Sequence, residues 1–139
     1  MDYELAERWL ANLESGEFQQ TRSRLMRNAA QLCCLGVLCT TAGATWERDD
    51  VGDFRPIIAG IKNKDNSVLI KPIRELFGLD SHLHKLCWVM NDGEAHNNEL
   101  LAAAGLEPRK HTFKEIAAFL RPILLEGKKL PAAVYRVPL

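Results

Sequence analysis

The stretch LCCLGVLC, residues 32–39, carries three cysteines among eight otherwise apolar or small residues. It lies within a longer segment, Leu25 to Ala42, in which apolar residues occupy nearly every direction of a helical wheel. A helix that is apolar all round is normally enclosed by other elements, so this segment predicts a central buried helix. Gly43 is expected to end it, because glycine readily adopts the left-handed conformation that follows many helices.

The three thiols of this predicted helix would point in different directions. Successive helical residues turn by about 100°, which places Cys34 and Cys39 at roughly 100° and 240° from Cys33. Zinc needs ligands within about 2.3 Å of one centre, so no metal site is expected. Buried cysteine behaves as a small apolar residue, and Gly36 would let another backbone approach, so we expect a packing role. A nucleophilic thiol is the alternative, and it would need a histidine or a cation such as Arg27 nearby.

The length and composition of the chain predict one globular domain over residues 1–139. A chain of this length buries about 68% of the surface that its unfolded form exposes, which is enough for one core. The 18 basic and 18 acidic side chains cancel, so neither nucleic acid nor a membrane is expected as a partner. No apolar run reaches the roughly 18 residues that cross a bilayer, and the acidic start MDYELAERWL is unlike a signal peptide. We therefore expect a cytoplasmic protein with reduced thiols.

The remaining sequence predicts short helices and a small β element. An apolar residue at every fourth position predicts a helix over Tyr3–Glu14. Turn residues, β-branched residues and Pro56 between positions 44 and 67 indicate loops with one or two edge strands. The tail 132–139 alternates like a short strand, which we expect to pair near Ile57. The predicted class is α+β, a predominantly helical domain with a small antiparallel β element.

Local start and stop signals mark four further helices. Pro72 suits the first turn of a helix that Gly78 would end. A second helix is expected within residues 81–93, where Asn, Asp and Gly close it. Leu100–Ala104 forms another turn or two, and a capping box at residues 112–115 opens the last helix.

The last helix raises the question of DNA binding. The stretch HTFKEIAAFLR, residues 111–121, is similar to the first helix of a helix-turn-helix unit. Pro122 and an apolar stretch follow where a recognition helix should stand, and Pro122 is expected to kink or end the helix. We therefore do not expect DNA binding.

Asp49, Asp50 and Asp53 lie in a glycine-containing loop without a histidine, which indicates solvated charge. We therefore do not expect a catalytic residue among them.

Five motifs follow one another along the chain: WLANLESGEFQQ, LMRNAAQLCCLGVLC, IKPIRELFGL, MNDG and TFKEIAAFL. Arg27 stands six residues before Cys33, and Asn91 and Asp92 form an adjacent pair. In these features the chain resembles a widespread set of small phage-encoded proteins that is largely without assigned biochemistry. The resemblance implies a phage source.

Small accessory phage proteins commonly redirect or inhibit a host component. The resemblance therefore implies a host-interaction or counter-defence protein that binds a bacterial protein in the host cytoplasm, without catalysis or a cofactor. This chain departs from the family pattern in the segment Glu94–His111 and in a tail after Leu125. The inserted segment is the expected partner surface, and an ordinary helical elaboration is the alternative.

A second hypothesis is a protein that binds or sequesters a nucleotide-type small molecule. Arg24 and Arg27 would bind phosphate or carboxylate at the rim of a cleft, where Asn91 and Asp92 would recognise hydroxyl groups or a base edge. Enclosed cavities of this kind often lie between subunits, so the hypothesis allows a homo-oligomer. Alternatively, Asn91 and Asp92 are capping or turn residues that bind nearby backbone. A minor cysteine-dependent enzyme is the third hypothesis.

Overall fold

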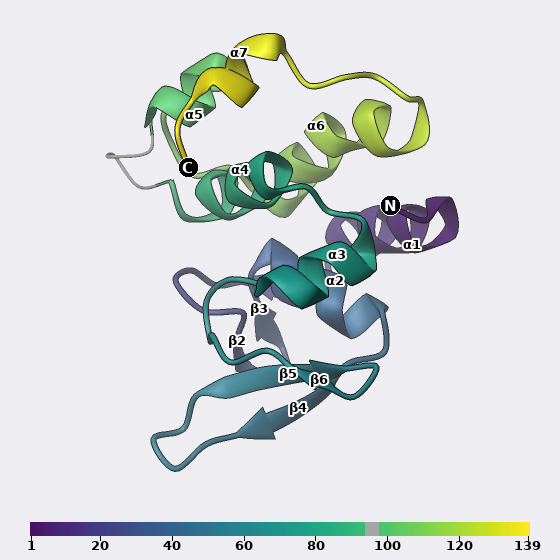
Figure 1. Ribbon diagram of the computed structural model, residues 1–139. Coiled ribbons are helices and arrows are strands. Elements are labelled where there is room, and N and C mark those ends of the chain that lie inside the picture. The colour runs from purple at the N-terminus through teal and green to yellow at the C-terminus, as the bar shows by residue number, and fades with distance from the viewer. Residues whose placement is uncertain (94–97) are drawn as a thin grey trace.

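The computed structural model describes residues 1–93 and 98–139, and these form seven helices and six short strands (Figure 1). The helices are α1 (Tyr3–Glu14), α2 (Cys34–Thr41), α3 (Lys71–Phe77), α4 (Ser81–Asp92), α5 (Asn98–Ala103), α6 (Phe113–Leu125) and α7 (Ala132–Arg136). The strands are β1 (Gln19–Gln20), β2 (Met26–Asn28), β3 (Gln31–Leu32), β4 (Thr45–Arg48), β5 (Phe54–Ile58) and β6 (Ile61–Lys62). Helices dominate and most strand pairs are antiparallel, so the predicted α+β class is confirmed.

The strands form two small sheets. In the first, β3 lies between β1 and β2, parallel to β1 and antiparallel to β2. The second is an antiparallel meander in the order β4-β5-β6, which Figure 1 shows projecting away from the helices. Its three strands lie between positions 44 and 67, where one or two edge strands were expected. Pro56 lies in β5, the central strand, so its assignment to an edge strand is wrong. The sheets therefore sit at one end of a mainly helical molecule.

The predicted helix over Leu25–Ala42 is wrong in its first half. Helix α2 begins at Cys34, and residues 26–32 form the short strands β2 and β3 instead. The Asn28 side chain accepts a hydrogen bond from the Ala30 N–H at 2.9 Å and stabilises a tight turn between these strands. Strands and helix both bury apolar side chains here, so the helical wheel could not distinguish them.

The chain before β2 crosses directly over α2 at Gly36. A Cβ atom on Gly36 would lie 1.9 Å from the carbonyl oxygen of Leu25, so only glycine permits this approach. The close backbone contact expected beside the cysteines is therefore confirmed. Helix α2 ends at Thr41, and Gly43 follows in the left-handed conformation with φ of 85°, as predicted.

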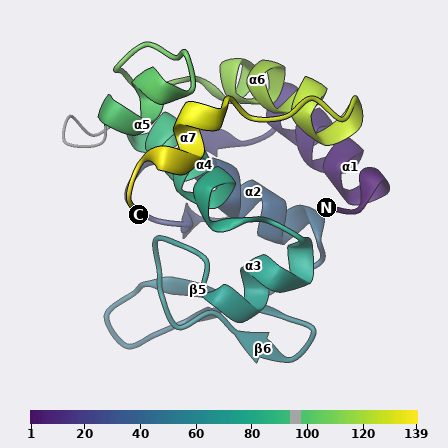
Figure 2. The same ribbon diagram turned by 45° about the horizontal axis from the view of Figure 1, so that its top comes forward.

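The predicted C-terminal strand is also wrong, because residues 132–136 form the helix α7. Ile57, the expected pairing partner, already pairs on both sides, with Thr45 of β4 and Lys62 of β6. The tail instead buries Val134, and α7 packs against α5. Figure 2 shows α7 lying over the helices α4 and α5.

Helices with strong local signals at their ends are confirmed. Helix α1 spans the predicted Tyr3–Glu14. Helix α3 has Pro72 in its first turn and Gly78 in the left-handed conformation just past its end. The capping box at residues 112–115 opens α6 with both of its hydrogen bonds formed. Pro122 does not end α6, which continues past it as a helix.

One cluster of buried apolar side chains runs through the described residues. It includes all four cysteines together with large side chains from α1, α2, α4 and α6. Trp9 of α1 donates from Nε1 to the Cys34 carbonyl oxygen at 2.9 Å and joins α1 to the start of α2. This core positions the first turn of α2 beside the last turn of α4, where the candidate site lies.

Candidate functional site

The four thiols are buried and form no disulfide. Cys33 precedes α2 as its N-cap, and its sulfur accepts a hydrogen bond from the Gly36 N–H at 3.4 Å. Burial nevertheless raises the pKa of Cys33 to about 12, because desolvation outweighs these backbone hydrogen bonds. Burial also raises the pKa of Cys34, whose S–H donates to the Cys87 carbonyl oxygen at 3.3 Å. The thiols of Cys33 and Cys34 therefore stay protonated at neutral pH, and all four cysteines pack in the core.

Two kinds of site are not found in the described ranges, 1–93 and 98–139. Within them, no group of three or more His, Cys, Asp or Glu side chains is placed to hold a metal ion. The same residues contain no helix that has both the length and the apolar character to cross a membrane.

Asn91, in the last turn of α4, is the buried centre of the candidate site. Only 1% of this residue is exposed. Its Oδ1 accepts from the Cys34 N–H at 3.1 Å, and its Nδ2 donates to the Thr21 carbonyl oxygen at 2.8 Å. A backbone donor on one side and a backbone acceptor on the other fix the orientation of this amide. Asn91 therefore joins the end of α4 to the start of α2 and to the segment after β1.

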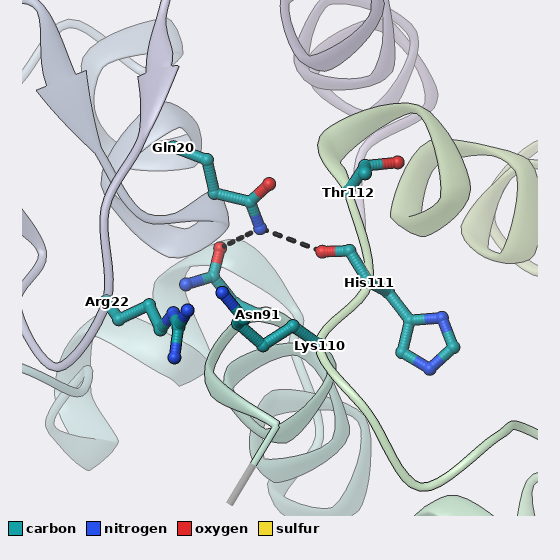
Figure 3. Close-up of a pocket in the computed structure, with 6 residues that line it drawn as sticks. All are labelled: Gln20, Arg22, Asn91, Lys110, His111 and Thr112. Atoms are coloured by element: carbon teal, nitrogen blue, oxygen red, sulfur yellow. Dashed lines mark hydrogen bonds between the residues drawn. The ribbon is translucent and has the colours of Figure 1, made fainter.

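Gln20, the last residue of β1, extends this network. Its Nε2 donates to Asn91 Oδ1 at 2.9 Å and to the His111 carbonyl oxygen at 2.8 Å (Figure 3). Both neighbours are acceptors, so the nitrogen of the Gln20 amide must face them. The Gln20 Oε1 accepts no hydrogen bond from the residues that the structure describes, and it remains available to a ligand.

A pocket of about 310 Å³ opens beside this network. Its lining residues are Gln20, Arg22, Asn91, Lys110, His111 and Thr112. Arg22 and Lys110 are exposed, and Figure 3 shows them extending toward the same space from two walls. Within the described part of the chain, neither forms an ion pair with a carboxylate. The pocket thus offers two cations beside an amide oxygen and a hydroxyl group.

Close backbone contact holds Lys110 against the end of α4. Gly93 follows α4 with φ of 64°, and a Cβ atom there would lie 2.4 Å from the backbone nitrogen of Lys110. The His111 N–H donates to the Met90 carbonyl oxygen at 2.7 Å. The neighbouring Arg109 already forms ion pairs with two glutamates, each at 2.6 Å. Lys110 is therefore the cation of this segment that can meet a ligand.

Of the four predicted binding residues, two lie at this site and two do not. Asn91 lines the pocket, and Asp92 beside it accepts from the Ser23 N–H at 3.2 Å. Arg24 instead forms an ion pair with an aspartate in the β4–β5 connection. Arg27 is exposed on β2 and does not line the pocket. Asn91 and Asp92 bind neighbouring protein groups, which is the alternative considered for them from the sequence.

Of the six residues that line this pocket, only Asn91 was predicted as a binding residue. The five that the sequence analysis missed are Gln20, Arg22, Lys110, His111 and Thr112. Arg22 stands in the same basic cluster as Arg24, but Ser23 between them adopts a left-handed φ of 63° and turns the chain. One arginine therefore reaches the pocket and the other does not. Gln20 belongs to the motif WLANLESGEFQQ, so that motif was a usable signal. No spacing pattern marks Lys110.

The expected partner surface, Glu94–His111, is described only in part, because residues 94–97 lie outside the described residues. The remaining part forms α5, which buries Leu100 and Leu101 in the core. It then forms the connection that carries Lys110 into the pocket. The described part of this segment thus packs as a helical elaboration and also supplies a wall of the candidate site.

All the residues that line this pocket lie in the part of the chain that matches a family model. The model covers residues 1–122, and its description is Domain of unknown function (DUF8296). The chain belongs to this family. No curated protein and no solved structure matches the chain. The DUF8296 match leaves out residues 123–139, which form the end of α6 and the whole of α7.

Proposed function

We propose that this protein acts by binding rather than by catalysis, and that the Arg22–Lys110 pocket holds a small anionic ligand of nucleotide type. The observation that carries the proposal is the convergence of these two cations on one polar pocket. A guanidinium group binds phosphate or carboxylate through two parallel hydrogen bonds, and an ammonium group adds a point charge. The buried thiols of Cys33, Cys34 and Cys39 support the non-catalytic part, because burial raises the pKa of each and disfavours the reactive thiolate.

The other polar groups of the pocket suit a ligand that carries hydrogen-bond donors beside its anionic group. The Gln20 Oε1 accepts from a hydroxyl or amino group, and the Thr112 hydroxyl donates to an oxygen. Asn91 acts indirectly, because its own hydrogen bonds hold the Gln20 amide in this orientation. A phosphate group next to sugar hydroxyls or a base amino group has this combination of groups.

Thermal denaturation with a panel of ligands tests the proposal. The panel contains inorganic phosphate, nucleoside mono-, di- and triphosphates, and cyclic dinucleotides. A ligand present at 100 times its Kd should stabilise the native chain by about 2.7 kcal/mol. Arg22→Gln should reduce this stabilisation to about 1.4 kcal/mol at the same ligand concentration, because a tenfold weaker ligand is then present at only about 10 times its Kd. The matched control Arg27→Gln, an exposed arginine outside the pocket, should retain the full stabilisation. Absence of stabilisation by every panel member at millimolar concentration would contradict the proposal.

Iodoacetamide labelling of the native protein at neutral pH tests the absence of a nucleophilic thiol. Thiolate is the reactive form, and burial raises the pKa of Cys33 to about 12. We expect slow labelling in the native state and rapid labelling of all four cysteines in urea. Fast, stoichiometric modification of one native cysteine would favour the cysteine-dependent enzyme instead.

A second candidate function is that of a phage accessory protein that binds and inhibits a bacterial protein in the host cytoplasm, as a host-interaction or counter-defence factor. The resemblance to small phage-encoded proteins supports it, and so does a surface formed by residues 123–139, which the family match leaves out. Affinity purification from infected cells, followed by direct binding of the purified host protein, tests this function. Mass analysis of small molecules released on denaturation distinguishes it from ligand sequestration.

A further inference from the structure

The last seventeen residues, 123–139, have a basic and partly apolar composition, and all of them except Leu130 and Val134 are half-buried or exposed. They contain three cations and one acidic side chain, in a chain whose net charge is zero. The end of α6, the connection after it and α7 carry these residues across α4 and α5 (Figure 2). The concentration of positive charge on this tail is therefore a local feature, which the total charge conceals.

A pocket of about 470 Å³ lies between this tail and the start of α4. Its apolar walls include Leu83 of α4, Ile123 of α6 and Leu130 of the connection. The side chain of Tyr135 borders it from α7 and is 51% exposed. Tyrosine combines a large apolar ring with a polar tip and is enriched at protein–protein interfaces.

An adjoining pocket of about 270 Å³ shares three lining residues with the first, namely Ile123, Lys128 and Lys129. Both lysines are exposed, and neither forms an ion pair with the residues that the structure describes. Two hollows thus share one cationic border. We call the two pockets together the Lys128–Lys129 groove.

Asp80 also lines this groove, but its carboxylate is occupied. Its Oδ1 accepts from the Leu83 N–H at 2.8 Å, and its Oδ2 accepts from the Tyr135 hydroxyl at 3.3 Å. These hydrogen bonds cap α4 and tie α7 to it. The two lysines are therefore the charged groups of the groove that can meet the charge of a partner.

We propose that the Lys128–Lys129 groove binds an acidic peptide segment of a partner protein, which inserts apolar side chains and pairs its carboxylates with Lys128 and Lys129. This inference rests on the host-interaction function proposed above and names the surface responsible. Charge complementarity selects an acidic partner, because two lysines border the groove. Two adjoining hollows along one border suit alternate apolar side chains of an extended peptide, because side chains two positions apart point to the same face.

Titration of the full chain, labelled with ¹⁵N, against synthetic pentapeptides tests this inference by NMR. The peptides are Asp-Asp-Phe-Asp-Asp, its cationic counterpart Lys-Lys-Phe-Lys-Lys, and Asp-Asp-Ala-Asp-Asp. The first should shift amide signals of residues 123–136 and of the start of α4. The second should not bind, and the third should bind about tenfold more weakly because it lacks the apolar anchor.

A charge-reversal pair provides the matched control. Lys128→Glu/Lys129→Glu should weaken binding of Asp-Asp-Phe-Asp-Asp by about tenfold, because two border ion pairs are lost. Lys64→Glu/Lys114→Glu makes the same change of net charge at exposed lysines outside the groove and should change binding less than about twofold.

Three outcomes would overturn the inference. The first is an absence of shifts in residues 123–136 at millimolar peptide, and the second is equal binding of the acidic and cationic peptides. The third is concentration-dependent self-association that Lys128→Glu/Lys129→Glu abolishes, since a second copy of this chain would then occupy the groove. If a host protein binds wild type and Lys128→Glu/Lys129→Glu equally, the host-interaction function stands and this groove is not its surface.

Discussion

Asn91 and Arg22 line the same pocket, but they differ in burial and in the partners of their side chains. Asn91 is 1% exposed and makes four hydrogen bonds, all to protein groups. Arg22 is exposed and forms no ion pair within the described residues. A buried amide must find its partners inside the fold, whereas an exposed cation leaves its hydrogen bonds to water or to a ligand. Substitution should therefore reduce stability at Asn91 and ligand affinity at Arg22.

Asn91→Ala should show the largest effect. It leaves the Cys34 N–H, the Thr21 carbonyl and the Gln20 amide without this partner, so the free energy of unfolding should fall by about 4 kcal/mol. Urea denaturation measures it. The control Asn28→Ala removes an exposed turn residue and should cost about 1 kcal/mol. If the two variants lose the same free energy of unfolding, burial of Asn91 does not explain its contribution to stability.

His84 extends the comparison to a second buried polar group. It is 5% exposed, and its Nε2 accepts from the Leu69 N–H at 3.0 Å. Burial lowers the pKa of His84 to about 4, with a further contribution from Arg74 and an opposing one from Asp65. Between pH 6.5 and about 4 the unfolded chain binds more protons at this residue. The contribution of neutral His84 to the free energy of unfolding is therefore fully present above pH 6.5, and it should decrease by roughly 3 kcal/mol as the pH falls to about 4.

Urea unfolding at about pH 7, 5.5 and 4 measures this dependence in wild type and in His84→Gln. Only the wild-type protein should lose the additional stability, because glutamine does not titrate. If the two proteins lose stability in parallel, His84 does not carry the pH dependence and other groups do.

Gly93→Ala tests whether the end of α4, next to Asn91, positions Lys110. A Cβ atom at Gly93 would lie 2.4 Å from the backbone nitrogen of Lys110. The free energy of unfolding should therefore fall by about 2 kcal/mol, and Lys110 should be displaced. Gly127→Ala is the matched control, because Gly127 has a similar φ of 73° but nothing within 4 Å of an added Cβ atom. It should lose about 1 kcal/mol from backbone strain alone. Weaker ligand binding in Gly93→Ala only would confirm that this contact positions Lys110.

Arg22→Gln and Lys110→Gln should have the smallest effects on stability. Both side chains are exposed, so each substitution should change the free energy of unfolding by less than about 0.5 kcal/mol. Each should nevertheless weaken a nucleotide-type ligand by about tenfold, because a charged hydrogen-bond donor is lost. Calorimetric titration and urea denaturation of the same samples measure both quantities. A loss of stability as large as that of Asn91→Ala would assign these cations to the fold.

Elements whose ends are set by neighbouring residues were predictable from the sequence. Helix α3 between Pro72 and Gly78, and α6 with its capping box, follow from local hydrogen bonds and backbone preferences. The first half of the predicted helix over Leu25–Ala42 failed for a non-local reason. The Cys33 N–H donates to the Leu25 carbonyl oxygen at 3.1 Å, and this backbone contact over Gly36 leaves no trace in hydrophobic periodicity.

The candidate site was predictable only in part for similar reasons. The pair Asn91 and Asp92 stood out as turn residues and as a motif, and it does lie beside the pocket. Whether Arg22 or Arg24 reaches the pocket depends on the left-handed φ of Ser23, a conformation that is uncommon for serine and could not be predicted from the sequence. The Ser23 N–H is held by the Asp92 carboxylate, so a residue distant in the chain selects Arg22 over Arg24.

The hydrogen bonds of Asn91 span long stretches of the chain, 57 positions to Cys34 and 70 to Thr21. Contacts of such separation form late in folding, because the intervening chain must first be brought together. A nascent polypeptide that ends with α4 contains Gln20, Arg22 and Asn91 but lacks residues 110–112, so one wall of the pocket is missing. Capture of a ligand would therefore report that synthesis has passed Thr112 and that the two walls have folded together.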